Sequence, residues 1–380
     1  MEAKQEIEKQ KKYIEKVKKI NNNKKLKYNI YTMGCQLNEN DSEKLCGMIE
    51  DMGYEKTNDA KEANLCVFNT CCVRENAEDK LFGKLGELKR LKETNGLIIA
   101  IGGCMMQEKH ITDKIKESYP FVDILFGTHT LHKFPEDLYK IIEEKKKLED
   151  ILDIDGKIYE GLPIKRTSKT QASVTIMNGC NNFCTYCIVP YVRGRERSRE
   201  PRAIIEEVKK LAKEGYKEIT LLGQNVNSYL RVEREKNIPF EEYEGVNSFA
   251  TLLKAVNKIE QIERIRFISP HPKDFTDDVI EAIATCDKVC KLVHLPLQSG
   301  STNVLKAMNR KYTKEQYLNL VDKMKSKIPN LALSTDIIVG FPGETEEDFE
   351  DTLDVVKKVN FEQVYMLSLI HISEPTRQAE

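Results

Sequence analysis

Three short hydrophobic stretches in the first third of the chain each end at a cysteine. They cover residues 28–34 before Cys35, 64–70 before Cys71 and 97–103 before Cys104. With a fourth strand-like run at 121–126, they alternate with helical patterns at 41–52 and 75–93. This alternation predicts an open parallel α/β sheet, in which ligands bind at the carboxyl ends of the strands. We therefore expect the three cysteines to meet at one edge of that sheet as ligands of one metal cluster.

A second set of cysteines, Cys180, Cys184 and Cys187, follows a later strand-like run. The strand-like runs of this region are 173–178, 218–222, 262–268, 291–295, 331–338 and 361–366, with helical patterns such as 202–213 and 314–325 between them. Repeated strand–helix units of this length predict a full or partial (βα) barrel, whose active site forms at the carboxyl ends of the strands. The second cysteine set lies in the loop after the first of these strands.

Three thiolates on a [4Fe–4S] cluster leave one iron without a protein ligand. The Cys-x3-Cys-x2-Cys spacing, with Tyr186 before the last cysteine, resembles the signature of radical S-adenosylmethionine (SAM) enzymes. That resemblance implies that the open iron chelates the amino and carboxylate groups of SAM. The alternative is a zinc site, but zinc usually takes a fourth Cys or His at short spacing. None follows within 188–202, and the next histidine is His271, so the cluster is favoured.

Composition limits the other function classes. Eleven cysteines, an odd number, without a signal peptide indicate reduced thiols in the cytoplasm. No apolar run approaches the ~20 residues that span a bilayer, so we expect no membrane contact. The net charge of −1 provides no global basic field, and any RNA contact must come from local patches. The lysine- and glutamate-rich start, 1–26, is read as a charged extension: a solvated, frayed helix in preference to an RNA-binding arm.

The motifs taken together resemble the methylthiotransferase family of radical SAM enzymes. The matching stretches are 33–38 with 41–43, 69–75, 102–107, 177–195, 223–229, 294–300 and 336–344, and they extend the resemblance over roughly 28–366. The resemblance implies an auxiliary [4Fe–4S] cluster on Cys35, Cys71 and Cys104, which supplies or carries the inserted sulfur. It further implies two SAM molecules per turnover and a reductase that supplies electrons. We expect a monomer.

The resemblance also implies a SAM pocket on the barrel, with no catalytic side chains beyond the cluster ligands. The cofactor-binding candidates are Tyr186, Gly223, Gln224, Asn225, Gln298, Asp336 and Pro342, the last with Gly343. Each has a structural alternative, because glycine and proline at strand ends commonly just make turns.

A basic segment follows the second cysteine set. Its arginines are Arg193, Arg195, Arg197, Arg199 and Arg202, partly neutralised by Glu196 and Glu200. A solvated charge run is the default interpretation, but we favour contact with the phosphate backbone of a tRNA anticodon loop, with Arg193, Arg195 and Arg197 as candidates.

Within the family, Gln36 and the stretch 225–229 favour the branch that methylthiolates C2 of N6-dimethylallyladenosine at position 37 of tRNA. The rival substrates are threonylcarbamoyladenosine tRNA and a ribosomal-protein aspartate. A rival of another class is a non-catalytic iron–sulfur or zinc protein that binds RNA.

The remaining cysteines are interpreted as core residues: Cys46, Cys66, Cys286 and Cys290. Cys72 is the exception, because it neighbours Cys71 and the sequence leaves open a swap of ligand between the two.

The domain prediction is a charged extension over 1–26, a cluster-binding domain over 27–141, a polar linker over 142–165 and an incomplete radical SAM domain over 166–366. The final 367–380 departs from the family pattern and looks like the translation of a sequencing adapter. We therefore expect a non-native tail, with the end of the barrel and the family's small RNA-binding β-barrel (TRAM) domain missing.

Overall fold

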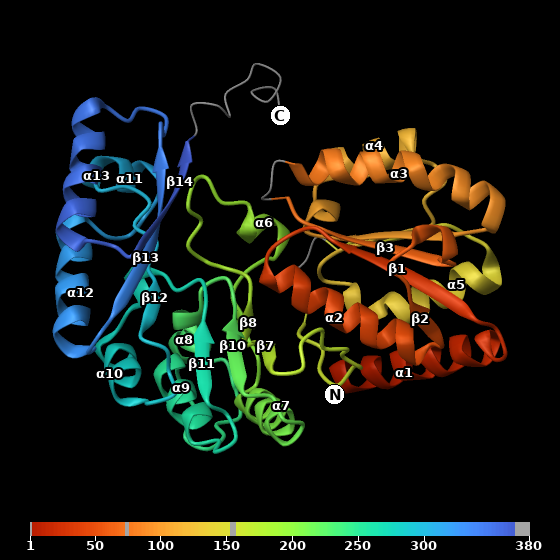
Figure 1. The fold of residues 1–380 in the computed structure, drawn as a ribbon, viewed down its shortest axis with the longest axis horizontal. Helices are drawn as coiled ribbons and strands as arrows, with labels where there is room; N and C mark the ends of the chain where they lie inside the picture. Colours follow the sequence, from red (N-terminus) through yellow and green to blue (C-terminus); the bar gives the residue numbers. More distant parts are fainter. Residues whose placement is uncertain (1, 73–75, 153–156, 369–380) are drawn as a thin grey trace. The chain divides into compact units, whose positions relative to one another are not determined.

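The computed structural model describes residues 2–72, 76–152 and 157–368 (Figure 1). The chain forms two compact units. The first is Met1–Ser168 with Ile188–Arg195, and the second is Lys169–Cys187 with Glu196–Glu380. The predicted tail beyond Ser368 lies outside the described residues.

The first unit contains a six-stranded, fully parallel sheet in the order β2-β1-β3-β4-β5-β6. Its strands are β1 (Leu26–Thr32), β2 (Tyr54–Lys56), β3 (Leu65–Thr70), β4 (Ile98–Gly103), β5 (Ile124–Phe126) and β6 (Leu148–Asp150). The open parallel α/β sheet predicted from the sequence is confirmed. The prediction missed β2 and β6, which at three residues each are too short to show a period of two.

Helices cover both faces of this sheet (Figure 1). They are α1 (Glu2–Asn21), α2 (Gln36–Asp51), α3 (Asn76–Asn95), α4 (Lys109–Ser118) and α5 (Phe134–Glu144), with short 3-10 turns η1 (Ala60–Glu62), η2 (Cys104–Gln107) and η3 (Leu131–Lys133). Because side chains alternate along a strand, β3 turns Leu65 and Val67 toward α1, α2 and α5, and Cys66 and Phe68 toward α3 and α4. Cys66 and Cys46 are buried core residues, as predicted.

The N-terminal helix α1 is part of the folded unit, so its prediction as a solvated, frayed extension is wrong. Ile14 and Val17 are buried in the same core as α2 and α5. The Gln10 side chain is fully buried and donates to Glu136 of α5 at 3.2 Å. The composition of α1 hid this role, because its few apolar residues lie among many lysines and glutamates.

The predicted linker over 142–165 also contributes to the fold. It contains β6, the last strand of the sheet, and its end packs on α2, where a Cβ on Gly47 would lie 2.6 Å from the carbonyl of Pro163. Two residues just beyond the predicted linker donate to the buried carboxylate of Glu43: Arg166 at 2.8 Å and the Thr167 backbone amide at 2.9 Å. Residues 153–156 of this segment lie outside the described residues.

The second unit is a partial (βα) barrel, as predicted. Its parallel strands form two sheets, β7-β10-β11 and β12-β13-β14, in chain order. The strands are β7 (Gln171–Thr175), β10 (Glu218–Leu222), β11 (Arg264–Phe267), β12 (Leu292–His294), β13 (Ala332–Val339) and β14 (Gln363–Ser368). The predicted strand 173–178 is divided in two: β8 (Met177–Asn178) leaves the sheet and pairs antiparallel with β9 (Arg197–Ser198).

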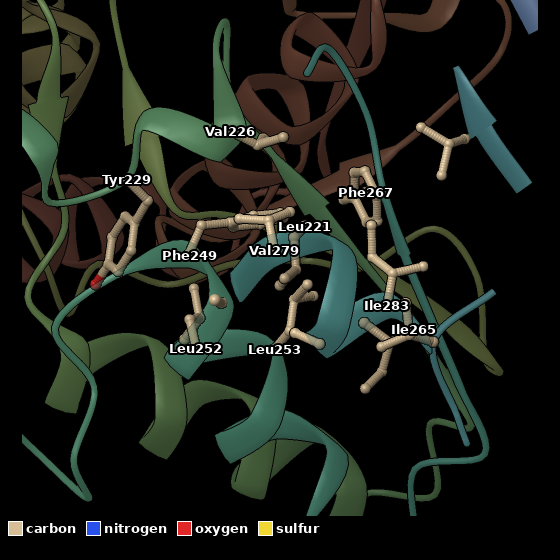
Figure 2. Close-up of a cluster of buried hydrophobic side chains, with 14 of the residues drawn as sticks. Leu221, Val226, Tyr229, Phe249, Leu252, Leu253, Ile265, Phe267, Val279 and Ile283 are labelled. Carbon is tan, nitrogen blue, oxygen red and sulfur yellow. The ribbon is translucent and has the colours of Figure 1, made fainter. Parts of the chain in front are cut away.

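The helices of the second unit are α7 (Pro201–Lys213), α8 (Arg231–Glu235), α9 (Phe249–Asn257), α10 (Asp277–Thr285), α11 (Thr302–Ala307), α12 (Lys314–Lys327) and α13 (Glu346–Val359), with turns η4 (Val226–Ser228) and η5 (Pro272–Asp274). The short α6 (Val189–Val192) belongs to the first unit. Figure 2 shows part of the barrel core, where Leu221 of β10 and Phe267 of β11 lie among Phe249, Leu253 and Val279 of the helices. Within the described residues, no helix is long and apolar enough to cross a membrane.

Candidate metal centres

The three cysteines of the first set follow neighbouring strands of the first unit. Cys71 comes directly after β3 and Cys104 directly after β4, and both are buried. Cys35 follows β1 by three residues, caps the start of α2 and is exposed. Since β1, β3 and β4 are adjacent and parallel, all three residues lie at the carboxyl edge of the sheet, as the sequence predicted.

A pair of buried asparagines connects the loops that carry these cysteines. The Cys35 thiol donates to Asn38 Oδ1 at 3.3 Å, and Asn38 Nδ2 donates to the Thr70 carbonyl at 2.9 Å, one residue before Cys71. In return, Asn69 Nδ2 donates to the Asn38 carbonyl at 2.8 Å. These bonds fix the Cys35 loop against the end of β3.

Glycine allows the third loop to approach the same point. Gly103 has a φ of 101°, a conformation that side chains rarely adopt, and a Cβ there would lie 2.3 Å from the Thr70 carbonyl oxygen. Gly34 is also closely packed, because its Cβ would lie 2.6 Å from Asn38 Cγ. The glycine before Cys35 and the one before Cys104 thus set the spacing of the loops.

A buried cation lies beside Cys104. Arg193 is 6% exposed; its Nε donates to Cys104 Sγ at 3.1 Å and its Nη1 to Asp41 at 2.7 Å. A hydrogen bond from the Cys72 thiol, aided by the Arg193 charge and opposed by burial, lowers the pKa of Cys104. The contact of Cys72 with Cys104 leaves both Cys71 and Cys72 as candidate ligands.

This burial corrects one prediction for the basic segment. A guanidinium held by a thiol and a carboxylate inside the fold has no surface to offer a phosphate, so the predicted RNA contact does not fit Arg193. Arg199 is likewise buried, donating to the Thr175 carbonyl at 2.6 Å and pairing with Glu207 at 2.8 Å. Arg195 is exposed and Arg197 partly so. The alternating pattern of arginines misled the prediction, since it carries no sign of which ones turn inward.

The second cysteine set lies after β8. Cys180 and Cys184 are buried and Cys187 is partly exposed. The three thiols are close enough to interact electrostatically, and burial, the main cause, raises the pKa of Cys180 to about 12. Deprotonation of that thiol therefore needs a compensating positive charge, such as a metal, beside it.

Two side chains from other loops of the second unit support this loop. Gln224 Oε1 accepts from the Gly179 amide at 2.6 Å, and Asn309 Nδ2 donates to the Phe183 carbonyl at 2.8 Å. Phe183 itself has a φ of 50°, in the left-handed region. The loop conformation is thus fixed by its neighbours.

The SAM candidates at the end of β10 are packed closely. A Cβ on Gly223 would lie 2.6 Å from the Met177 side chain, so any larger residue would require that side chain to shift. Asn225 is fully buried and donates to Glu196 at 3.1 Å and to Asp274 at 2.8 Å. Since these two carboxylates fix the amide orientation, its Oδ1, which has no partner in the described structure, is the atom left to accept a hydrogen bond.

The other SAM candidates lie on or around the β12-β13-β14 sheet of the second unit. Asp336 lies inside β13, where its carboxylate is 3.2 Å from His294 Nε2, and not at the strand end as expected. The backbone N–H of Gln298 donates to the backbone carbonyl of Asp336 at 2.8 Å, so these two segments of backbone lie side by side. Tyr186 packs against Met308 and Ile338. Pro342 is exposed beyond the end of β13.

Two residues that the sequence analysis missed lie in this region. Arg310 is 8% exposed, with Nη1 at 3.6 Å from Cys184 Sγ and 3.5 Å from the Tyr186 hydroxyl. His271 is buried; its Nδ1 accepts from the Lys273 amide at 3.2 Å, and its Nε2 has no hydrogen-bond partner among the described residues. Burial, with the nearby Arg310 charge, lowers the pKa of His271 well below its usual value and keeps it neutral. No spacing in the sequence distinguishes either residue from ordinary polar positions.

The donor chemistry of both sets fits iron–sulfur clusters. Each set provides three thiols and one buried guanidinium beside a thiol, and hydrogen bonds to sulfur stabilise an anionic cluster. In the described ranges, no three His, Cys, Asp or Glu side chains are arranged as a ready site for a single metal ion. The fit to a cluster therefore rests on the thiols and their surroundings and not on a preformed ion site.

Comparison with known proteins places the chain in a family. Residues 174–356 match the radical SAM superfamily and residues 27–127 match an uncharacterized protein family, UPF0004. The tRNA-2-methylthio-N(6)-dimethylallyladenosine synthase of Acetivibrio thermocellus is 54% identical over 368 residues, which cover 95% of this chain and 75% of that protein. The synthase of Clostridium tetani is 57% identical over 344 residues, covering 90% and 74%. The chain belongs to this synthase family.

Solved structures resemble this member of the synthase family in fold. The radical SAM methyltransferase TsrM of Kitasatospora setae superposes with a TM-score of 0.62 at 15% identity, covering 90% of this chain and 72% of that one. The cobalamin-dependent radical SAM enzyme OxsB gives a TM-score of 0.60 at 12% identity, covering 87% and 51%. The predicted radical SAM fold is confirmed.

Proposed function

We propose that this chain is a radical SAM methylthiotransferase that adds a methylthio group to C2 of N6-dimethylallyladenosine at position 37, in the anticodon loop of tRNA. The observation that carries the proposal is its 54–58% identity to synthases of this name over most of the chain. Its cofactors are [4Fe–4S] clusters and SAM, and a reductase supplies the electrons.

We assign one cluster to each cysteine set. Cys35, Cys71 and Cys104 hold the auxiliary cluster, and Cys180, Cys184 and Cys187 hold the cluster that binds SAM. When bound, these groups supply the inserted sulfur and the radical that activates an aromatic C–H too weakly acidic for side-chain bases.

The protein's own contribution is positioning. Arg193 and Arg310 donate to a thiolate sulfur of each set, which stabilises its negative charge. Asn38 and Asn69 hold the loops of the first set together. Gln224 positions the second loop through Gly179.

Among the SAM candidates, we propose that Tyr186, Gly223, Asn225, Gln298, Asp336 and Pro342 line the cofactor site. Asn225 is the best supported, because its buried Oδ1 faces no partner of its own and could accept from the amino group of SAM. Gln224 is assigned a positioning role in place of direct contact.

The target adenine has to leave its stack before its C2 can approach a cluster. An unpaired anticodon-loop base does this at lower cost than a paired one. Arg195 and Arg197 remain the proposed phosphate contacts, since they retain exposed surface. We also propose a cytoplasmic monomer; the odd number of free thiols supports a reducing compartment.

Mass spectrometry of tRNA nucleosides tests the function. A strain that lacks the gene should lose 2-methylthio-N6-dimethylallyladenosine and accumulate the unmodified dimethylallyl form. The wild-type chain should restore the product, and Cys180→Ala should not. An unchanged product level in the deletion strain would refute the assignment, while loss of a methylthiolated threonylcarbamoyladenosine or ribosomal-protein aspartate would identify a rival substrate.

The non-catalytic alternative is tested in vitro. After anaerobic reconstitution with iron, sulfide and SAM, the reduced protein should form 5′-deoxyadenosine. Failure to form it with both clusters present would favour an RNA-binding protein without radical chemistry.

A further inference from the structure

One tyrosine ring is far more exposed than a folded protein normally leaves an aromatic side chain. Tyr191 is 70% exposed, compared with 52% for Tyr365, the other exposed aromatic residue in the described ranges. Tyrosine is enriched where proteins bind partners, because its ring offers a large contact area with only two side-chain torsions to fix. The exposure of Tyr191 therefore indicates a contact surface.

The backbone that carries Tyr191 is held on both sides. Tyr191 lies on α6, between the buried residues Pro190 and Val192. Thr128 Oγ1 donates to the Val192 carbonyl at 2.7 Å, and the Arg193 amide donates to the Val189 carbonyl at 2.8 Å. A partner that binds the ring thus pays little to order the segment.

The end of α6 is also connected to the first cysteine set. The next residue after Val192 is Arg193, whose guanidinium bonds Cys104 and Asp41. Along the chain, Tyr191 follows the ligand candidate Cys187 by four positions, and the exposed Arg195 follows Tyr191 by four. The ring therefore follows the second set of cluster ligands closely in the sequence, and the helix that carries it is bonded to the first set through Arg193.

The chemistry of such a ring fits an unpaired RNA base. Every base has a flat π-face, and aromatic side chains in single-strand binding proteins stack on it. When one loop base turns out of its stack, the neighbouring base loses a stacking partner that an anchored ring can replace. A cation nearby would contact the adjoining phosphate.

We propose that Tyr191 is an RNA-stacking residue that binds a base of the single-stranded tRNA loop next to the target nucleotide. It acts in positioning and contributes affinity for unpaired RNA; it takes no part in cluster binding or SAM cleavage. This inference rests on the proposed function for its choice of RNA as the partner.

The test compares Tyr191→Ala with Tyr191→Phe, and uses Ile238→Ala as a matched control. Ile238 is another exposed apolar side chain, at 46%, on a loop of the second unit. The reconstituted proteins would be titrated anaerobically with a fluorescent anticodon stem–loop RNA carrying N6-dimethylallyladenosine, and with a fully paired RNA duplex of the same length.

We expect Tyr191→Ala to weaken stem–loop binding by about 5- to 150-fold, the range of one lost aromatic–base stack. Tyr191→Phe keeps the ring and should bind within about 2-fold of the wild type. Duplex binding, iron content and RNA-free formation of 5′-deoxyadenosine should not change in any variant, and Ile238→Ala should match the wild type throughout.

Wild-type affinity in Tyr191→Ala, equal losses for the stem–loop and the duplex, or no RNA binding by the wild type would each overturn the inference. A change of mass in light scattering without a change in RNA affinity would instead assign the ring to contact with a second copy of the chain. The proposed function is tested separately, by the tRNA nucleosides of the deletion strain. Ring-dependent RNA binding together with an unchanged nucleoside profile would separate the two.

Discussion

Two buried arginines give the cysteine sets their distinctive environment. Arg193 donates to Cys104 and Arg310 to Cys184, from positions far from those cysteines in the sequence. A buried charge is retained only where it is paired, and each guanidinium contacts a cysteine of a set that is proposed to hold a cluster. These contacts are set by the tertiary fold. In the sequence alone, Arg193 resembles part of a solvated basic run and Arg310 an ordinary polar position.

Replacing Arg193 should damage the first cysteine set selectively. Arg193→Gln removes the shorter of the two ion pairs of Asp41 and leaves the other, with Lys44 at 3.5 Å, so we expect unfolding free energy to fall by about 1.5–3 kcal/mol. The auxiliary cluster should be lost, while the SAM-binding cluster stays. Chemical denaturation and iron and sulfide analysis measure both effects, and the exposed Arg90→Gln provides the control. Wild-type iron content in Arg193→Gln would contradict the assigned role.

A second residue-scale prediction concerns pH. Burial, with the nearby charge of Asp150, raises the pKa of Asp137 from 3.8 to about 7. Because the folded pKa is higher than the unfolded one, the stability from this group is present below pH 3.8 and is lost as pH rises through 7. Asp137→Asn cannot ionise and should be more stable than the wild type at pH 8, by on the order of 4 kcal/mol.

The advantage of Asp137→Asn should shrink toward zero near pH 4. Thermal denaturation of the chain across pH 4–8 measures it. A difference between the two proteins that does not change with pH would show that folding leaves the pKa of Asp137 unchanged.

At the scale of elements, the sequence pattern predicted the bounds closely for segments that are long and apolar on one face, or that are buried on both faces. β10 occurs at 218–222 as predicted, and α7 and α12 differ from their predicted bounds by one or two residues. Short edge strands such as β2 and β6 were missed, because a three-residue strand gains its stability from its neighbour and not from its own pattern. The prediction for α1 failed for a similar reason, because this helix gains its stability from packing with α2 and α5 and not from a clear apolar pattern of its own.

Helix α1 should contribute measurably to stability. Ile14→Ala removes a side chain that is 5% exposed from the core shared with α2 and α5, and we expect a loss of about 2–4 kcal/mol. Lys12→Ala, on the exposed side of the same helix, should stay within about 0.5 kcal/mol. If both variants were equally stable in chemical denaturation, α1 would be a solvated extension, as the sequence predicted.

At the scale of the whole molecule, the two cysteine sets belong to separate units. Cys35, Cys71 and Cys104 lie in the first unit, and Cys180, Cys184 and Cys187 lie in the second. Each unit has its own hydrophobic core, so loss of one set need not disturb the other. This division permits independent loading of the clusters.

Independent loading predicts that Cys35→Ala and Cys180→Ala each lose about half of the iron and sulfide of the wild type. Cys290→Ala, a partly exposed cysteine outside both sets, should keep all of it. Iron and sulfide analysis after anaerobic reconstitution provides the measurement. Complete loss of iron in either single variant would show that one cluster depends on the other.

The sequence by itself determined the fold class, the two cysteine sets and the family, because strand periodicity, cysteine spacing and motif order are local properties of the chain. It also placed Cys35, Cys71 and Cys104 at one sheet edge, since the carboxyl ends of parallel strands necessarily meet there. Only the tertiary structure decided which arginines turn inward, that Arg310 and His271 lie near the second set, and that α1 and β6 complete the first unit. Those outcomes depend on contacts between segments far apart in the chain, and no local pattern records them.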